Sequence, residues 1–210
     1  MTDLHLLTKY FPQLTKEQLA LFNNLHDQII FWNERINLIS RKDTSNIVLH
    51  HILHSLAIAK YIKFESNATV LDIGTGGGFP GLPLAIFFPN THFHLVDSIA
   101  KKIMCVSEII KALELTNCEA ECIRAEKLQN QYEFVVTRAV ATMSDLNKWT
   151  TTSLKRKPLH ARPNGIIALK GGALEELEHF QAKNLEVKNL SDYFEEEFFA
   201  TKKLVYLPRL

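Results

Sequence analysis

The sequence predicts an α/β fold with a mostly parallel, doubly wound sheet, preceded by a helical extension. The first observation is that short apolar segments alternate with longer amphipathic ones. We expect strands at 69–74, 93–97, 119–123, 134–140 and 165–170, and helices at 80–88, 99–115, 144–154 and 173–182. Such alternation is typical of parallel sheets covered by helices. The second observation is a glycine-rich turn after the first strand. The third is an apolar segment at 203–207, expected to be an antiparallel strand.

The first 64 residues predict two helices that lie outside the alternating pattern. Residues 16–36 carry apolar side chains at steps of three and four, which favours an amphipathic helix. Thr15 and Gln18 have the spacing of a capping box at its start. A second helix is expected at 46–62, after a polar and basic connector. We therefore divide the chain into a helical extension, residues 1–64, and a main domain, residues 65–210.

Composition narrows the classes of function. The 210 residues can hold one α/β domain and an appendage, and 46% apolar and 22% charged residues are ordinary globular values. The net charge of +1 is not that of a general nucleic-acid binder, so such a role needs local basic patches. The segment 155–162 and the pair Arg41 and Lys42 are two candidates. No apolar run is long enough to cross a membrane, and residues 1–10 do not resemble a secretory signal.

The cysteines indicate a reducing compartment. Cys105, Cys118 and Cys122 form no C-x-x-C pair, and an odd, sparse count is typical of the cytoplasm, where we expect this chain. We expect all three to be buried small apolar side chains without a part in chemistry.

The glycine-rich turn predicts a ligand site. Residues 74–81 read Gly-Thr-Gly-Gly-Gly-Phe-Pro-Gly and follow an apolar strand. Glycine tolerates positive φ and lets a ligand approach the backbone, and a following helix offers free amides. Asp97 ends the next strand, 23 residues after Gly74. A carboxylate at this spacing reaches the ribose hydroxyls of a bound nucleoside. The pattern therefore indicates an adenosine-containing cofactor.

Two cofactors compete for this turn. Gly76, Gly78 and Gly81 fit the G-x-G-x-x-G dinucleotide fingerprint, which is a weak signal by itself. Asp72 lies two residues before the first glycine, and its charge would repel a pyrophosphate. The same charge suits the sulfonium and amino groups of S-adenosylmethionine. We therefore favour S-adenosylmethionine over a nicotinamide dinucleotide.

Three histidines lie in the second expected helix. His50 and His54 have the i, i+4 spacing of some zinc sites, but no third ligand is evident, so we expect no metal. His51 and Ser55 share a face and could line a pocket.

Together these features resemble the glucose-inhibited division protein B family, also called ribosomal small subunit methyltransferase G. The resemblance covers residues 32–175. It rests on Asn37-Leu38 with Asp43, His51-Ile52-Leu53, Gly74-Thr75-Gly76 with Phe79-Pro80-Gly81, Asp97-Ser98 with Lys101, Arg124 with Glu126, Thr137-Arg138-Ala139, and Ala168-Leu169-Lys170-Gly171. There is one departure, because His54 stands where many relatives carry an acid.

The resemblance implies a Rossmann-like class I S-adenosylmethionine-dependent methyltransferase fold. It implies methyl transfer to N7 of a guanine in small-subunit (16S) ribosomal RNA, with that RNA or the small ribosomal subunit as partner. The residues expected at the cofactor are Gly74, Gly76, Gly78, Phe79, Asp97, Ser98, Ala125, Glu126 and Arg138. Of these, Arg138 is the candidate catalytic residue. The residues expected at the RNA are His51, Arg41, Lys42, Arg124 and Lys170.

Other classes of function stay open at this point. A nicotinamide-dependent oxidoreductase would need a substrate histidine or lysine that the sequence does not place. A binding module would keep the turn without turnover. A small-molecule methyltransferase would not need the basic segments 41–42 and 155–162. We expect a monomer without membrane association.

Overall fold

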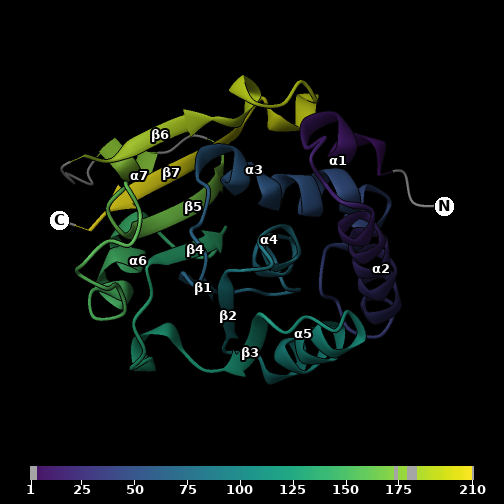
Figure 1. Ribbon diagram of the computed structural model, residues 1–210, viewed down its shortest axis with the longest axis horizontal. Helices are drawn as coiled ribbons and strands as arrows, with labels where there is room; N and C mark the ends of the chain where they lie inside the picture. The colour runs from purple at the N-terminus through teal and green to yellow at the C-terminus, as the bar shows by residue number, and fades with distance from the viewer. Residues whose placement is uncertain (1–3, 173–174, 179–183, 210) are drawn as a thin grey trace.

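A mixed sheet forms the centre of the molecule. The computed structural model describes residues 4–172, 175–178 and 184–209. Within them the strands are ordered β3-β2-β1-β4-β5-β7-β6 (Figure 1). The parallel strands are β1 (Thr69–Ile73), β2 (His92–Asp97), β3 (Cys118–Cys122), β4 (Phe134–Arg138) and β5 (Gly165–Gly171). The antiparallel strands are β7 (Lys202–Pro208), which pairs with β5, and β6 (Glu186–Asn189). The predicted α/β class and the antiparallel last strand are confirmed, whereas β6 was not expected.

The helices that connect the strands lie close to their predicted positions. They are α4 (Gly81–Phe87), α5 (Ala100–Ala112) and α6 (Met143–Thr150). Between β3 and β4 the chain forms only a 3-10 turn, Ala125–Lys127. Of the helix expected at 173–182, the four residues of α7 (Glu175–Glu178) are helical, and 173–174 and 179–182 lie outside the described residues.

The N-terminal segment differs from the prediction in its second helix. It contains α1 (His5–Tyr10), α2 (Lys16–Asn33), the 3-10 helix η1 (Arg41–Asn46), the π-helix η2 (Ile47–Leu53) and α3 (His54–Tyr61). The capping box of Thr15 and Gln18 is present. Helix α2 ends three residues early because the Asn33 side chain accepts the amides of Leu38 at 2.8 Å and Ile39 at 3.0 Å. The single helix expected at 46–62 is thus wrong: its first half is a π-helix.

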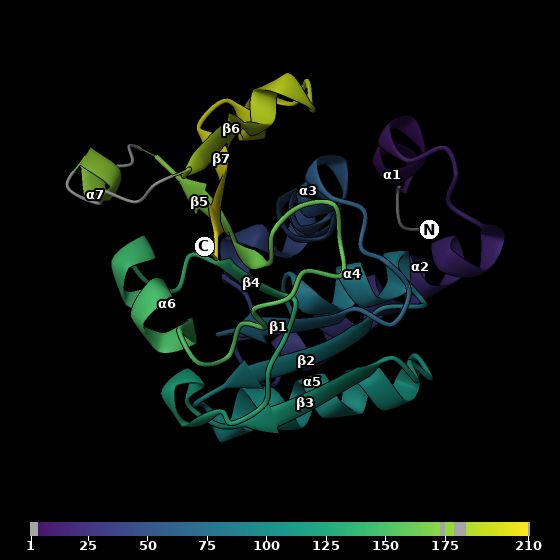
Figure 2. The same ribbon diagram turned by 60° about the vertical axis from the view of Figure 1, so that its left-hand side comes forward.

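The sheet is covered unequally on its two faces. One face packs against α1 to α5, with buried residues such as Val70, Leu95 and Val136 pointing to that side. The other face packs mainly against α6, whose Met143 and Leu146 are buried there. Figure 2 shows α6 on the opposite side of the sheet from α3 and α4. This arrangement leaves the carboxyl ends of the parallel strands open to a ligand.

The N-terminal helices share a core with the sheet. Gln18 of α2 donates to the carbonyls of Ile86 at 3.0 Å and Phe87 at 3.1 Å, at the end of α4. Residues of α1, α2 and α3 belong to the same apolar cluster as α4 and α5. No helix in the described part of the chain is long and apolar enough to cross a bilayer.

Candidate active site

A cleft of about 590 Å³ opens at the carboxyl ends of β1, β2 and β4. This volume lies in the usual range for small-molecule sites. The cleft is lined by Leu38, Ile73, Gly74, Thr75, Gly76, Gly77, Phe79, Val96, Asp97, Ser98, Lys102, Ile123, Arg124, Ala125, Glu126, Arg138, Ala139, Val140 and Trp149. Eight of the nine residues predicted at the cofactor are among them.

The glycine turn forms one wall of this cleft. Gly74 and Gly76 have φ of 65° and 58°, in the left-handed region that favours glycine. A β-carbon on Gly76 would meet nothing closer than 3.9 Å, so a side chain there would fill the cleft instead of clashing with protein. Gly78 is the exception among the predicted residues. It does not line the cleft, and a β-carbon there would lie 2.2 Å from Leu82. Gly78 therefore serves the packing of α4.

Asp72 lies beneath the turn and not in the cleft. It is fully buried, and its Oδ2 accepts the Thr75 hydroxyl at 2.6 Å and the Gly81 amide at 2.9 Å. Burial raises its pKa to about 7, although these hydrogen bonds oppose the shift. The expectation that this acid would face a cofactor cation is wrong, because its hydrogen bonds turn it toward the backbone. Asp72 holds the turn and the start of α4.

Asp97 occupies the predicted place at the end of β2. Its Oδ2 accepts the Gly76 amide at 3.0 Å, and its Oδ1 accepts the Ile99 amide at 2.9 Å. The carboxylate therefore links the glycine turn to the start of α5. Ser98 follows in the cleft wall, and each oxygen of Asp97 keeps a further lone pair for a ligand.

Arg138 ends β4 and is held by the N-terminal segment. Its Nη1 donates to the His50 carbonyl at 3.0 Å, and its Nη2 lies 2.9 Å from Nδ1 of His51. The guanidinium lies 5.1 Å from the centre of the Phe79 ring. Burial lowers the pKa of Arg138 to about 10, which leaves it charged at neutral pH. The next residue, Ala139, has a φ of 54°, a strained value for alanine.

His51 is a neutral support for this arginine. Burial, and next the Arg138 charge, lower the pKa of His51 to about 3. Because Arg138 only donates, Nδ1 of His51 accepts and its proton is on Nε2, which lies 3.9 Å from Oδ2 of Asp43. His51 is only 7% exposed and does not line the cleft. His51, which was expected at the RNA, thus lies against Arg138 and Phe79 and is not part of the cleft lining.

The far side of the cleft is formed after β3. Arg124, Ala125 and Glu126 line it together with Trp149 of α6. A second hollow of about 380 Å³ shares Arg124 and extends to Cys122 and Lys127.

The other residues predicted at the RNA lie outside the cleft. Arg41 and Lys42 are exposed on η1, three and four residues after Leu38 of the cleft wall. Lys170 does not line the cleft and donates to the Ala141 carbonyl.

The competing basic segment lies at the opposite edge of the sheet. Lys155 and Arg162 precede β5, and both have acidic partners. Lys155 lies 2.7 Å from Glu133, and Arg162 lies 2.9 Å from Glu186. Two of the four charges that made this segment a candidate are thus neutralised within the protein.

The cysteines and the remaining histidines differ in part from expectation. Cys105 is buried and Cys118 partly buried, but Cys122 is exposed. Its strand β3 is at the sheet edge, which leaves this thiol uncovered. His50 binds Asp43 at 2.9 Å, and His54 is buried. Within the described residues no three potential metal ligands converge.

Several cleft residues had not been predicted. Leu38 packs over Gly77, at 3.3 Å from the position of a β-carbon there, and Lys102 comes from the first turn of α5. Trp149 arrives from α6. Lys102 could have been found, since it follows the acid-ended strand by one helical turn. Leu38 and Trp149 carry no sequence signal that separates them from core residues.

Comparisons with known proteins agree with this geometry. A family model described as rRNA small subunit methyltransferase G matches residues 18–204. The Ribosomal RNA small subunit methyltransferase G of Flavobacterium johnsoniae is 52% identical over 96% of this chain and 96% of its own. The protein of the same name from Bacteroides fragilis is 50% identical over 96% of this chain and 98% of its own.

Solved structures support the fold alone. An rRNA methylase from Streptococcus thermophilus matches with a TM-score of 0.51 at 13% identity, over 76% of this chain and 95% of its own. A precorrin-6y C5,15-methyltransferase from Geobacter metallireducens matches with a TM-score of 0.53 at 13% identity, over 83% and 92%. The Rossmann-like methyltransferase fold is thus confirmed. Because the family model and the relatives match nearly the whole length, the chain belongs to the rRNA small subunit methyltransferase G family.

Proposed function

We propose that this chain transfers a methyl group from S-adenosylmethionine to N7 of a guanine in 16S ribosomal RNA. The observation that carries the proposal is the cleft at the carboxyl ends of β1, β2 and β4, in a chain that belongs to this methyltransferase family. The cleft is formed by a glycine turn, an acid-ended strand and a cationic side chain.

The cleft suits S-adenosylmethionine. The space that a β-carbon on Gly76 would fill admits a ligand against bare backbone. We assign the methionine part to Gly74, Gly76 and Phe79, with its carboxylate on Arg138. Asp97 and Ser98 would hold the ribose, and the adenine would lie by Ala125 and Glu126.

Methyl transfer to guanine N7 requires little acid–base chemistry from the protein. The cofactor supplies a methyl group on a positively charged sulfur, which is already activated for displacement. Guanine N7 has a free lone pair and carries no proton, so no general base is required. What remains for the chain is to hold N7 in line with the methyl carbon, a contribution from positioning. Arg138 would fix the cofactor's carboxylate and so the direction of the methyl group.

The RNA side of the proposal concerns shape and charge. N7 lies on the major-groove edge, which is deep and narrow in A-form RNA, so the target is in a loop or irregular region. Arg124 lines the cleft, and Arg41 and Lys42 are exposed after Leu38 of its wall, which supports phosphate contacts for all three. Ribosomal RNA as substrate supports a cytoplasmic location.

The division of labour follows from the same geometry. We propose that residues 1–64 hold Arg138 and present basic side chains, while residues 65–210 bind the cofactor. The hydrogen bonds from Arg138 to His50 and His51 support this division.

The test is a reconstituted reaction. Small ribosomal subunits and naked 16S rRNA from a strain without the enzyme are incubated with the purified chain and S-adenosylmethionine. Nucleoside mass spectrometry should then detect N7-methylguanosine in one substrate or both. A thermal shift with S-adenosylhomocysteine but not with NAD should accompany it. Absence of N7-methylguanosine from both substrates would refute the function, and a larger shift with NAD would refute the cofactor.

A further inference from the structure

Exposed apolar side chains occur on α2 and at the start of α5. Among the described residues six large apolar side chains are clearly exposed, and three of them lie on these two helices or at their ends. They are Phe31 at 45%, Ile99 at 48% and Met104 at 49% exposure. Ile99 follows Ser98 of the cleft wall, and Phe31 lies in the last turn of α2. An exposed aromatic ring such as Phe31 offers a surface on which a planar group can stack.

An aromatic ring and a cation are stacked at the end of α2. The Arg35 guanidinium lies 3.6 Å from the centre of the Phe31 ring, and Trp32 meets the same ring edge-on at 5.4 Å. Arg35 also bonds to the Phe31 carbonyl, and its charge is only loosely matched by Glu34 at 3.8 Å. Both Phe31 and Arg35 are exposed. The pair therefore presents a preformed flat surface to solvent.

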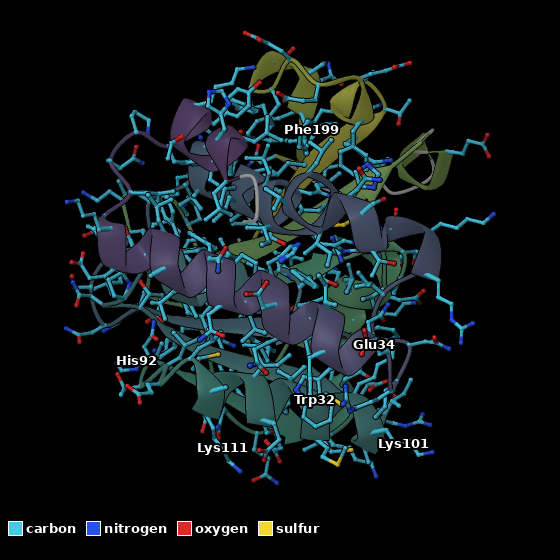
Figure 3. All side chains as sticks on the ribbon, turned by 90° about the vertical axis from the view of Figure 1, so that its right-hand side faces the viewer. Trp32, Glu34, His92, Lys101, Lys111 and Phe199 are labelled. Atoms are coloured by element: carbon cyan, nitrogen blue, oxygen red, sulfur yellow. The ribbon has the colours of Figure 1, made fainter. Side chains whose placement is uncertain are left out.

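This stack belongs to the cleft end of the molecule. Asn33 lies two residues after Phe31, and its side-chain oxygen accepts the amides of Leu38 and Ile39. Leu38 lines the cleft. Figure 3 shows Trp32, Glu34 and Lys101 at one end, while Lys111, from the other end of α5, lies away from them. Glu34, one residue before Arg35, thus lies on the same side as Lys101 at the start of α5.

Cations of the cleft lining, of η1 and of the first turn of α5 are available to a polyanion. In the described part of the chain, Arg41, Lys42, Lys101, Lys102 and Arg124 have no acidic side chain within ion-pair distance. Cations beside exposed aromatic surface are typical of sites for unpaired nucleotides, whose bases stack on rings or on arginine planes.

We propose that the Phe31–Arg35 stack is a docking platform for an unpaired base of the ribosomal RNA, next to the methylated guanine. The inference rests on the proposed function and deepens it, since it names the part of the RNA that is held outside the cleft. A base on the platform would anchor the strand while the neighbouring cations bind its phosphates.

The test separates stacking from charge. Phe31→Ala removes the ring, Phe31→Tyr keeps it, and Leu159→Ala is a matched control because Leu159 is 53% exposed in the segment at the opposite edge. The RNA Kd is measured by filter binding of naked 16S rRNA at several salt concentrations, and KM and kcat by methyl transfer. Thermal unfolding and the Kd of S-adenosylhomocysteine report on the fold and the cofactor site.

The expected pattern is specific to a stacked base. Phe31→Ala should raise the RNA Kd and KM about tenfold, with the salt slope, the kcat and the S-adenosylhomocysteine Kd unchanged. Phe31→Tyr and Leu159→Ala should stay within about twofold of the wild type. The double variant of Arg41→Ala and Lys42→Ala should instead lower the salt slope by about 0.7–0.9 for each lost phosphate contact.

Three results would overturn the platform. They are a Phe31→Ala protein that binds RNA like Leu159→Ala, a Phe31→Tyr protein as weak as Phe31→Ala, and a loss confined to assembled subunits, which would identify a ribosomal protein as the partner. Failure of the proposed function can be distinguished from these results. If the wild type methylates no guanine N7, the RNA Kd of each variant can still be measured and still tests the platform.

Discussion

Replacement of Arg138 by alanine should damage both the fold and the reaction. From the sequence, an arginine after the fourth strand reads as a loop residue whose removal leaves the fold intact. The structure corrects this, because the side chain joins β4 to the N-terminal segment through the His50 carbonyl and His51. It also lies over Phe79. Arg138→Ala therefore leaves two acceptors without their donor and one ring without its cation.

The magnitude follows from those contacts. A buried acceptor without a donor costs about 1–3 kcal/mol, and His51 is only 7% exposed. Two such acceptors give a loss of about 2–5 kcal/mol, after allowance for water reaching the exposed part of the site. For a chain of this size each kcal/mol lowers the Tm by about 2–4 °C, so the Tm should fall by about 4–20 °C. The stability of Arg138→Lys should lie between that of the wild type and that of Arg138→Ala, since one ammonium group cannot bind both acceptors in the geometry of a guanidinium.

The assay combines unfolding with turnover. Urea unfolding gives the free energy, and methyl transfer is measured at a temperature where the variant is folded. Activity should fall strongly there as well, because the cofactor's carboxylate loses its partner. Arg156→Ala, an exposed cation of the opposite edge, should change stability by less than about 0.5 kcal/mol. An Arg138→Ala protein within 1 kcal/mol of the wild type would refute the reasoning from the two acceptors.

Three further predictions concern other parts of the cleft. Asp97→Ala should weaken S-adenosylhomocysteine binding by on the order of 1.5–3 kcal/mol in calorimetry, since it removes charged acceptors, and unchanged affinity would exclude Asp97 from the ribose site. Burial lowers the pKa of His51 to about 3 and that of His54 well below 6.5, so the unfolded chain binds two protons that the folded chain does not. Burial also lowers the pKa of His160, whereas Asp72, with its pKa raised to about 7, opposes one of these protons. Stability should therefore fall by about 1–3 kcal/mol per pH unit from pH 6 to 4.5, and His54→Leu should flatten that slope in urea unfolding. Cys122 should react with a maleimide more slowly when S-adenosylhomocysteine is bound, and its replacement by serine should leave methyl transfer intact. Trapping of a cysteine–RNA adduct would contradict a direct methyl transfer to N7 without a cysteine nucleophile.

The parallel part of the sheet could be predicted because its signals are local. β1, β2, β4 and β5 are short, mainly apolar runs, whereas β3 is mostly exposed and alternates with glutamates at the sheet edge. The expected bounds of β1 to β5 differ from the observed ones by two residues at most. The glycine turn and Asp97 were found for a similar reason. The positive φ at Gly74 and Gly76 favours glycine, which is visible in the sequence, and Asp97 follows at a fixed spacing.

Other features depend on contacts between distant segments. The π-helix η2 reads as an ordinary helix, because its apolar residues have helical spacing whichever hydrogen-bond register they adopt. The π-helical hydrogen-bond register brings the His50 carbonyl and the His51 ring to Arg138, which is 87 residues away from His51 in the sequence. π-Helical turns are often found at functional sites, and this one supports the candidate catalytic arginine. The spacing of apolar residues along the sequence cannot predict this contact between η2 and β4.

Asp72 shows how a correct conclusion can rest on a wrong contact. The acid favoured S-adenosylmethionine through its charge, and the family confirms that cofactor. Yet Oδ2 of the carboxyl accepts from Thr75 and Gly81 beneath the turn, and Oδ1 is buried without a hydrogen-bond partner among the described residues. The acid at this position therefore holds the glycine turn and the start of α4.

Two charged groups of the cleft, Asp97 and Arg138, are already hydrogen-bonded before any ligand arrives. Both oxygens of Asp97 accept backbone amides, and two nitrogens of Arg138 are held by His50 and His51. Such groups lose little freedom when a cofactor binds, so more of the interaction energy is kept for holding it in one orientation. A reaction that needs no proton transfer gains most from this arrangement, since its rate depends on the alignment of the methyl carbon with N7. Asp97 and Arg138 therefore fix the glycine turn and the N-terminal segment, and the reaction proposed requires alignment from them and no acid–base pair.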